Sequence, residues 1–425
     1  MATGPMPRRT ESPGELALVL TGGGARAAYQ VGVLRTLVRH VPDLRFPIIT
    51  GVSAGAINAA FLASRAHALP EAVEELTHLW SNLRAEDIFR VDSAFLLRNL
   101  ARWGARLLSG GSNVGGQVRS LVDTTPLRTL LDHALGADDG AIPGIAENIE
   151  RGVLRAVTLT TLDYATGQTV SWVQGRDVTT WERPNRRSVL TRLTTSHVMA
   201  SAALPLIFPA VPLDGTWHGD GGVRHAAPLS PAVHLGAGRI IAVSTRCARA
   251  CARPPLRPVP YPPPAQIVGL LTDAVFLDLL DQDALRLQRF NEMIEKVPVE
   301  ERGDSRCIGL HLLRPLQDLG RLAAHHEIEL PWSFRFLLRG LGSREKPSAE
   351  FLSLLMFEPH YLKRLIAIGE DDGERHLEEV LALIDRGSTV ENARATRARA
   401  VTRPRRRGLV ARCVSAAGRL LKVSA

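Results

Sequence analysis

Cysteines and long apolar runs are scarce in this sequence. Its 425 residues include four cysteines, with neither a CxxC pair nor a Cys/His spacing typical of zinc sites, so we expect reduced thiols and a reducing compartment. The first 14 residues are polar and proline-rich, and the apolar run that follows, Leu16 to Leu20, is too short for a secretory signal. No stretch approaches the ~18 apolar residues that a membrane-spanning helix needs. These absences exclude a disulfide scaffold and predict a cytoplasmic protein whose membrane contacts are peripheral.

Most of the chain also lacks an excess of one charge. The formal net charge is +9, but residues 391–425 contain ten Lys or Arg and a single acid, Glu391. The first 390 residues therefore hold 42 basic and 42 acidic side chains. A neutral body argues against a nucleic-acid-binding protein, and only the arginine-rich tail keeps that interpretation open.

The basic tail shows helical spacing within residues 387–425. Apolar residues such as Leu409, Val410 and Leu420 fall on one helical face, and Arg412, Arg419 and Lys422 fall on the other. A short basic amphipathic helix of this kind would lie on an anionic membrane surface. A disordered, solvated tail is the alternative.

The body alternates strand and helix patterns and contains 45% apolar residues, enough for a sizeable core. Buried strands alternate with amphipathic helices, which predicts an α/β fold with parallel strands and with functional loops at the strand C-terminal ends. We expect strands at 16–20, 46–50, 154–159, 169–173, 239–244 and 307–312, and helices at 27–39, 56–68 and 268–296.

Changes in composition suggest how the chain is divided. Residues 253–264 include seven prolines, typical of a stiff, extended connector. We expect a disordered N-terminus (1–14), an α/β domain (15–250) with a helical cap insertion (87–131), the linker (253–264), a mainly helical region (265–386) and the tail (387–425). The predicted helix 268–296 carries four aspartates that do not share one face: Asp273, Asp278, Asp281 and Asp283. We expect them to cap helix ends or to lie on a solvated face, because their spacing differs from that of oxygen-rich metal loops. The sequence therefore predicts neither a metal site nor a cofactor.

Gly51-Val52-Ser53-Ala54-Gly55 is a G-x-S-x-G motif between a predicted strand and a predicted helix. In that context the serine occupies a sharp strand-to-helix turn that exposes Oγ, and small flanking residues allow the two backbones to pass closely. The positive end of the following helix would point at the reacting centre. Ser53 is therefore a candidate nucleophile, with Gly51 and Gly55 in support.

A second glycine-rich loop, Gly22-Gly23-Gly24, follows the first strand, with Arg26 at the start of the next helix. Its amides could hold either a nucleotide phosphate or the oxyanion of an acyl transfer. The dinucleotide fingerprint fails because Ala27 stands where a glycine is required. The serine motif about 30 residues later favours an oxyanion hole, and Arg26 would steady the loop or attract an anionic head group.

A serine nucleophile needs a base, and Asp220-Gly221-Gly222 supplies a carboxylate in a glycine-rich turn. Asp220 could serve if burial near Ser53 raises its proton affinity. His218 and His225 leave a Ser/His/Asp triad open, although we expect both histidines to be turn or surface residues.

These three segments, together with Ala200 to Pro209, resemble the patatin-like phospholipase family, in particular its bacterial cytoplasmic branch. The resemblance covers about Leu16 to Thr245 and departs from many relatives at Ala27. It implies a three-layer α/β/α fold and a Ser53/Asp220 dyad that hydrolyses acyl esters of phospholipids or lysophospholipids without a metal or other cofactor. It also implies that Gly22, Gly23 and Gly24 form the oxyanion hole, supported by Arg26, Gly51, Gly55, Gly221 and Gly222.

Two other functions remain open at this stage. One is a triad esterase, and the other is a membrane-surface binding protein without catalytic activity.

Overall fold

The computed structural model describes residues 14–90, 120, 122–247, 279–303, 305–326 and 349–385. Gly14–Leu383 forms one compact unit, and the two terminal segments form a second unit that lies almost wholly outside these ranges. The predicted N-terminal disorder, the central part of the cap insertion, the proline-rich linker and the basic tail therefore lie outside the described residues.

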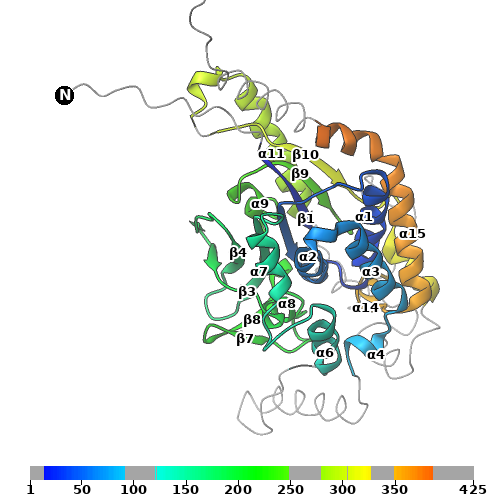
Figure 1. Cartoon of the computed structure of the whole chain (residues 1–425). Coiled ribbons are helices and arrows are strands. Elements are labelled where there is room, and N and C mark those ends of the chain that lie inside the picture. Colours follow the sequence, from blue (N-terminus) through cyan, green and yellow to red (C-terminus); the bar gives the residue numbers. More distant parts are fainter. Residues whose placement is uncertain are drawn as a thin grey trace, which may run out of the picture. The chain divides into compact units, whose positions relative to one another are not determined.

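One mixed sheet organises the compact unit (Figure 1), in the order β10-β9-β1-β2-β3-β4-β6-β5, with β8 paired to β3 and β7 paired to β8. The first five strands of that order run parallel, and β4 and β8 are antiparallel to β3. Its strands are β1 (Glu15–Leu20), β2 (Ile48–Val52), β3 (Ala156–Asp163), β4 (Thr169–Gly175), β5 (Glu182–Arg183), β6 (Arg186–Leu190), β7 (Val211–Leu213), β8 (Thr216–Asp220), β9 (Ala237–Val243) and β10 (Gly309–Leu313).

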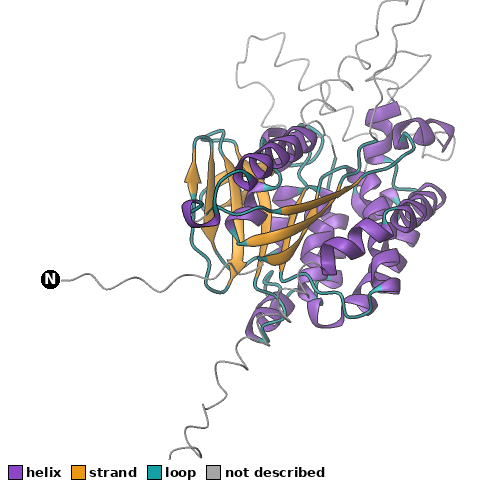
Figure 2. Ribbon diagram, turned by 90° about the horizontal axis from the view of Figure 1, so that it is seen from above, coloured by secondary structure: helices purple, strands orange, loops and turns teal. Residues whose placement is uncertain are grey.

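Helices lie on both faces of the sheet (Figure 2), as the α/β prediction requires. On one face α2 packs on β1, β2 and β3, and α1, α3 and α15 form an outer group beside it. On the other face lie α9 and α11. The main helices are α1 (Ala28–His40), α2 (Ala54–Ser64), α3 (Leu69–Asn82), α4 (Ala85–Ile88), α6 (Thr125–Ala134), α7 (Pro143–Glu150), α8 (Thr195–Ser201), α9 (Ser230–His234), α11 (Leu279–Glu295), α12 (Leu319–His326), α14 (Ala349–Leu355) and α15 (Pro359–Arg375).

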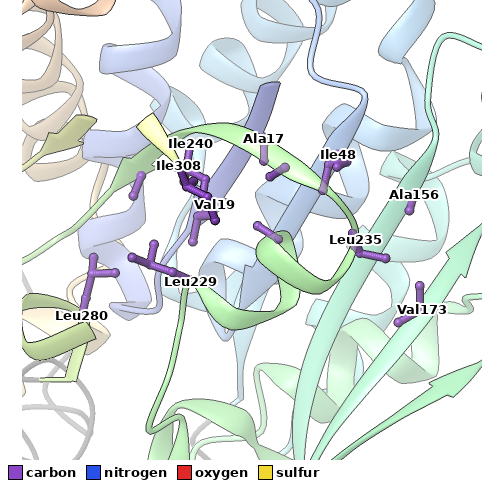
Figure 3. Packing of buried hydrophobic residues seen from close by; sticks show 13 residues of the cluster. Ala17, Val19, Ile48, Ala156, Val173, Leu229, Leu235, Ile240, Leu280 and Ile308 are labelled. Carbon is purple, nitrogen blue, oxygen red and sulfur yellow. The ribbon is translucent and has the colours of Figure 1, made fainter. Parts of the chain in front are cut away.

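A cluster of buried apolar side chains lies between the sheet and the helices α9 and α11 (Figure 3). It explains why the sequences of the central strands are continuously apolar. Ala17 and Val19 of β1 and Ile240 of β9 point into it, and Leu229 and Leu280 reach it from the helical layer. Because parallel strands are buried on both faces, the alternate residues Leu16, Leu18 and Leu20 are buried as well.

Residues after the proline-rich stretch complete the same unit. β10 extends the sheet beside β9, and α15 packs along α1. The packing is close, because a Cβ at Gly32 of α1 would lie 1.9 Å from the Ile366 carbonyl oxygen of α15. The C-terminal region thus contributes directly to the layers around the sheet.

The predicted central strands and the first two helices are confirmed within a few residues. The short strands β5 to β8 were not predicted, because they lie at the edge or pair antiparallel and lack a long apolar run. No helix among the described residues is long and apolar enough to cross a membrane.

Candidate active site

Ser53 occupies a strained turn between β2 and α2, as its motif predicted. Its backbone has φ 57° and ψ −132°, a conformation that residues with a side chain rarely adopt. The Ser53 carbonyl accepts the first helical hydrogen bond, from Ala56 at 2.8 Å. The serine therefore sits at the N-terminus of α2, where the helix dipole favours a developing negative charge.

The glycines of the serine motif permit two close backbone approaches. A Cβ at Gly51 would lie 2.4 Å from the Gly55 carbonyl oxygen and 2.6 Å from Ala59 Cβ. A Cβ at Gly55 would lie 2.4 Å from the Thr21 carbonyl oxygen and 2.5 Å from that of Leu20. Any side chain at either position would push α2 away from the sheet and move Ser53.

Asp220 is the last residue of β8, rather than part of a free turn, and the sheet register brings it to Ser53. Val52 pairs with Thr160 of β3, and Asp220 pairs with the next residue, Thr161. Gly221 is needed just after it, because a Cβ there would lie 2.3 Å from the Thr160 carbonyl oxygen. Ser53 and Asp220 thus meet at the C-terminal ends of two strands that both pair with β3, although they are 167 positions apart in the sequence.

The environment of Asp220 suits a base that works near neutral pH. The side chain is 1% exposed, and its Oδ1 accepts a hydrogen bond from the Gly222 amide at 2.8 Å. Oδ2 is buried and has no aligned donor among the described residues. Burial raises the pKa of Asp220 to about 7, and the nearby Ser53 hydroxyl and the Gly222 amide limit that rise.

The glycine loop after β1 lies directly against Ser53. A Cβ at Gly22 would be 2.8 Å from Ser53 Cβ, and Gly23 and Gly24 line the same pocket as Ser53 and Asp220. Gly23 and Gly24 have φ values of 152° and 55°. Thr245 holds the loop from the neighbouring strand end, since its hydroxyl donates to the Gly22 carbonyl at 2.7 Å.

Arg26 is buried, which excludes an exposed surface role for it. Its side chain is 3% exposed, and Nε donates a hydrogen bond to the Ser353 hydroxyl at 2.6 Å. The arginine therefore steadies the glycine loop by joining it to α14.

An apolar pocket opens beside Ser53, and its empty space, together with the open space at its mouth, amounts to about 810 Å³. Its floor carries Ser53, Asp220, Gly23 and Gly24. Its walls come from α2, α3, α6, the segment after α8 and the C-terminal region: Ala54, Ile57, Leu79, Trp80, Leu83, Ile88, Leu127, Leu130, Leu131, Ala202, Leu204, Phe208, Leu354, Leu355 and Phe357.

The prediction that His218 and His225 are turn or surface residues is wrong, because both side chains are buried. His218 Nδ1 and Nε2 contact the hydroxyls of Thr161 and Thr216 at 3.0 and 2.9 Å. His225 lines a separate small cavity behind Gly22 and Gly222. Among the described residues, no histidine forms a hydrogen bond with Ser53 or Asp220.

The sequence did not predict a buried polar chain that links the pocket wall to the glycine loop. Trp80 Nε1 donates to Asn58 Oδ1 at 2.8 Å, and Asn58 Nδ2 donates to Gln30 Oε1 at 3.0 Å. Gln30 Nε2 then donates to the Thr21 carbonyl at 2.8 Å. Gln30 and Asn58 lie inside the two family-like segments, but nothing in the pattern indicated that they are paired.

The described ranges contain no cluster of three or more His, Cys, Asp or Glu side chains that could hold a metal ion. Asp281 forms an ion pair with Arg314 at 3.0 Å, and Asp283 accepts a hydrogen bond from the Leu229 amide at 2.9 Å. These contacts agree with a structural role, and Asp273 and Asp278 lie outside the described residues. Within the described ranges, Cys247 and Cys307 form no disulfide bond.

Comparison with protein families gives a match over residues 18–233 to the model described as patatin-like phospholipase. Comparison with curated protein sequences gives no significant match. The matched range contains the glycine loop, Ser53 and Asp220, and it ends before the C-terminal residues of the pocket wall.

Similar solved structures have low sequence identity to the chain. Human group IVD cytosolic phospholipase A2, in complex with methyl γ-linolenyl fluorophosphonate, is 13% identical with a TM-score of 0.42, over 88% of this chain and 59% of that one. The type III effector ExoU of Pseudomonas aeruginosa is 17% identical with a TM-score of 0.34, over 86% and 53%. VipD from Legionella pneumophila is 13% identical with a TM-score of 0.33, over 86% and 67%. The chain thus spans from about half to two thirds of the length of these structures.

Proposed function

The chain belongs to the patatin-like phospholipase family, and from this premise we propose that it hydrolyses acyl ester bonds of phospholipids, lysophospholipids or related lipids. Ser53 is the nucleophile, Asp220 is the general base, and the amides of the loop Gly22 to Gly24 hold the oxyanion. The observation that carries the proposal is a buried carboxylate with a pKa of about 7 beside a serine on a strained turn, both in one apolar pocket.

In the first half-reaction, Ser53 Oγ attacks the ester carbonyl carbon while Asp220 takes the hydroxyl proton. The carbonyl oxygen becomes an oxyanion, which amide N–H groups and the N-terminus of α2 stabilise. Within the described structure the Gly23 and Gly24 amides donate to no other protein group, which supports this role. The intermediate collapses when the C–O bond to the alcohol breaks and Asp220 returns its proton to the leaving oxygen.

In the second half-reaction, a water molecule gives its proton to Asp220 and attacks the acyl-serine. The second oxyanion uses the same amides, and its collapse breaks the bond to Ser53 Oγ. Asp220 then returns the proton to Ser53 as the fatty acid leaves. A pKa near 7 suits both directions of transfer, because the group binds and releases a proton at small cost.

Ser53→Ala and Asp220→Asn test this assignment directly. Each should lower kcat on p-nitrophenyl butyrate and on phosphatidylcholine vesicles by roughly 10³-fold or more. Ser64→Ala is the matched control, since Ser64 is a buried serine of the same helix α2 with its hydroxyl bonded to the Phe61 carbonyl. A fluorophosphonate should label wild type and Ser64→Ala but not Ser53→Ala. Wild-type turnover in a folded Ser53→Ala protein would refute the proposal.

The triad alternative is tested by the same assay. His218→Ala and His225→Ala should retain far more activity than Asp220→Asn, because neither imidazole bonds to the dyad. Equal loss in a histidine variant and in Asp220→Asn would favour a triad. If a fluorophosphonate failed to label the wild-type chain, the alternative of a membrane-surface binding protein without catalytic activity would be favoured.

We also propose that the protein is cytoplasmic and that its tail, residues 391–425, contacts anionic membrane. The charge distribution supports the second of these. Deletion of residues 391–425 should weaken sedimentation with anionic vesicles and leave hydrolysis of soluble esters intact. Unchanged sedimentation would contradict a membrane role for the tail.

A further inference from the structure

Part of the pocket wall comes from residues far beyond the family match. The family model ends at residue 233, whereas Leu354, Leu355 and Phe357 line the pocket that contains Ser53. Leu354 and Leu355 end α14, and Phe357 follows two residues later. All three side chains are almost fully buried.

The same segment is seated on the glycine loop beside the nucleophile. A Cβ at Gly24 would lie 2.1 Å from the Leu354 carbonyl oxygen, so only a glycine allows this approach. One residue earlier, Ser353 Oγ accepts the 2.6 Å hydrogen bond from the buried Arg26. The segment thus touches the loop that faces the reacting carbon and also forms a surface of the pocket.

Aromatic contacts fix the other end of the segment. The Phe357 ring stacks on Trp80 at a centroid distance of 6.4 Å and meets Phe89 edge-on, also at 6.4 Å. Phe89 in turn packs against Phe208 at 6.0 Å. Trp80 is held by its hydrogen bond to Asn58, so Phe357 closes a rigid wall.

The chemistry of this wall indicates what it contacts. Leu355 and Phe357 line the pocket together with Leu79 of α3, Leu83 just after α3 and Leu127 of α6, and all of these side chains are apolar. A phospholipid head group or a glycerol backbone would lose its hydration in such surroundings. An unbranched fatty acyl chain would instead exchange water for apolar contacts along its length.

We propose that residues 353–357 form an acyl-chain subsite in which Leu355 and Phe357 contact the fatty acyl chain of the substrate and set the preferred chain length. The inference rests on the proposed function, because the chain must extend from an ester carbonyl held at Ser53. A longer acyl chain has more methylene groups to place against this wall than a short one, so it gains more from the contact. The segment therefore acts on specificity, while Arg26 and Gly24 keep it aligned with the reacting carbon.

The test compares p-nitrophenyl laurate with p-nitrophenyl butyrate. Leu355→Ala and Phe357→Ala should each lower the laurate-to-butyrate ratio of kcat/KM about tenfold, mainly through KM for laurate. Leu352→Ala is the matched control: Leu352 is a fully buried leucine of the same helix that does not line the pocket. Its truncation should reduce stability by a similar amount and leave the ratio within about twofold of wild type.

An equal change of the ratio in Leu355→Ala and Leu352→Ala would overturn the inference, and so would an unchanged ratio in both pocket variants. If a truncated variant is too unstable to purify, Phe357→Leu keeps an apolar side chain and should lower the ratio about threefold. Failure of the proposed function looks different, because Ser53→Ala would then retain butyrate turnover whatever the chain-length ratio.

Discussion

The Ser201 hydroxyl accepts a hydrogen bond from the Ser53 amide at 3.0 Å and donates one to the Thr160 carbonyl at 2.6 Å. Ser201 is fully buried at the end of α8, and Ala203 beside it accepts the Asp220 amide at 3.0 Å. The short segment from Ser201 to Ala203 thus holds the backbones of both Ser53 and Asp220 near β3. The anchor matters because Ser53 has a positive φ that it would not keep by itself.

Ser201→Ala should therefore lower kcat on butyrate by roughly 10 to 100-fold, because the Ser53 turn relaxes and Oγ shifts relative to Asp220. KM should change little, since Ser201 does not line the pocket. Ser64→Ala, another buried serine hydroxyl bonded to a backbone carbonyl, should lose similar stability without loss of kcat. If Ser201→Ala and Ser64→Ala had equal kcat at matched stability, the hydrogen bonds of Ser201 would contribute to stability and not to the positioning of Ser53.

The pH dependence of the reaction should report Asp220. Because burial raises the pKa of its carboxyl to about 7, we expect the proposed base to be protonated, and therefore inactive, in acid. We expect kcat/KM to fall about tenfold per pH unit below about 7 and to level off above it. The rate of fluorophosphonate labelling should follow the same curve, since acylation uses the same base. If kcat/KM instead stayed at its plateau value down to pH 5, the assignment of Asp220 as the base would be contradicted.

Acid unfolding must be separated from this titration. Burial lowers the pKa of His197 and of His225 to about 4, below the value of about 6.5 in an unfolded chain. Between these values the unfolded state binds more protons, so stability declines as the pH falls from about 6.5 to 4. Circular dichroism at each pH, with activity recovered after return to pH 8, distinguishes a protonated base from an unfolded protein.

Local sequence patterns predicted the elements around Ser53, because each of them has its own signal. Leu16 to Leu20 is a short apolar run between polar segments, and the motif around Ser53 requires a strand before it and a helix after it. The glycines at 51 and 55 are explained by backbone contacts that any such turn makes. Asp220 could be paired with Ser53 only through the family resemblance, because the register of β3 brings them together.

The contacts that shape the pocket could not be predicted, because they join residues far apart in the chain. Arg26 and Ser353 are 327 positions apart, and neither has a neighbour in sequence that indicates the other. The burial of His218 was missed for a similar reason. A histidine beside glycines is typical of a turn, but pairing with β3 places it in the sheet, next to Trp172.

Gly24→Ala should reveal the close contact with α14. Gly136 provides the matched control, since φ is 55° at Gly24 and 58° at Gly136, but a Cβ at Gly136 meets nothing within 4 Å. Both variants should lose about 1 kcal/mol of unfolding free energy from the unfavourable backbone conformation. Gly24→Ala should lose a further ~1–3 kcal/mol because its methyl group overlaps the Leu354 carbonyl.

Urea unfolding and butyrate turnover check this pair. Gly136→Ala should keep wild-type kcat, whereas Gly24→Ala should lower it, because displacement of α14 moves the glycine loop. Equal losses of stability in the two variants would mean that α14 does not press on Gly24.

Asp220 and Asp163 should show opposite effects of charge on stability. The pKa of Asp220 is raised by burial, so between about 4 and 7 the folded state binds more protons than the unfolded state, and stability falls as the pH rises. Asp220→Asn removes this penalty and keeps an oxygen for the Gly222 amide. We expect it to be more stable than wild type by up to a few kcal/mol at pH 8, with the gain fading towards pH 4.

Asp163 lies at the end of β3, close to the same site, and provides the contrast. Burial alone would raise its pKa, but hydrogen bonds from the Ala165 amide at 2.9 Å and the Thr166 hydroxyl at 3.0 Å, together with His218, hold it below its usual value. Its charge therefore stabilises the fold above the unfolded pKa, and this contribution is lost as the pH falls. Asp163→Asn should be less stable than wild type at pH 8, and the deficit should shrink in acid. Urea unfolding of both variants from pH 5 to 8 measures the two trends, and a loss of stability at pH 8 in Asp220→Asn would contradict the raised pKa of the proposed base.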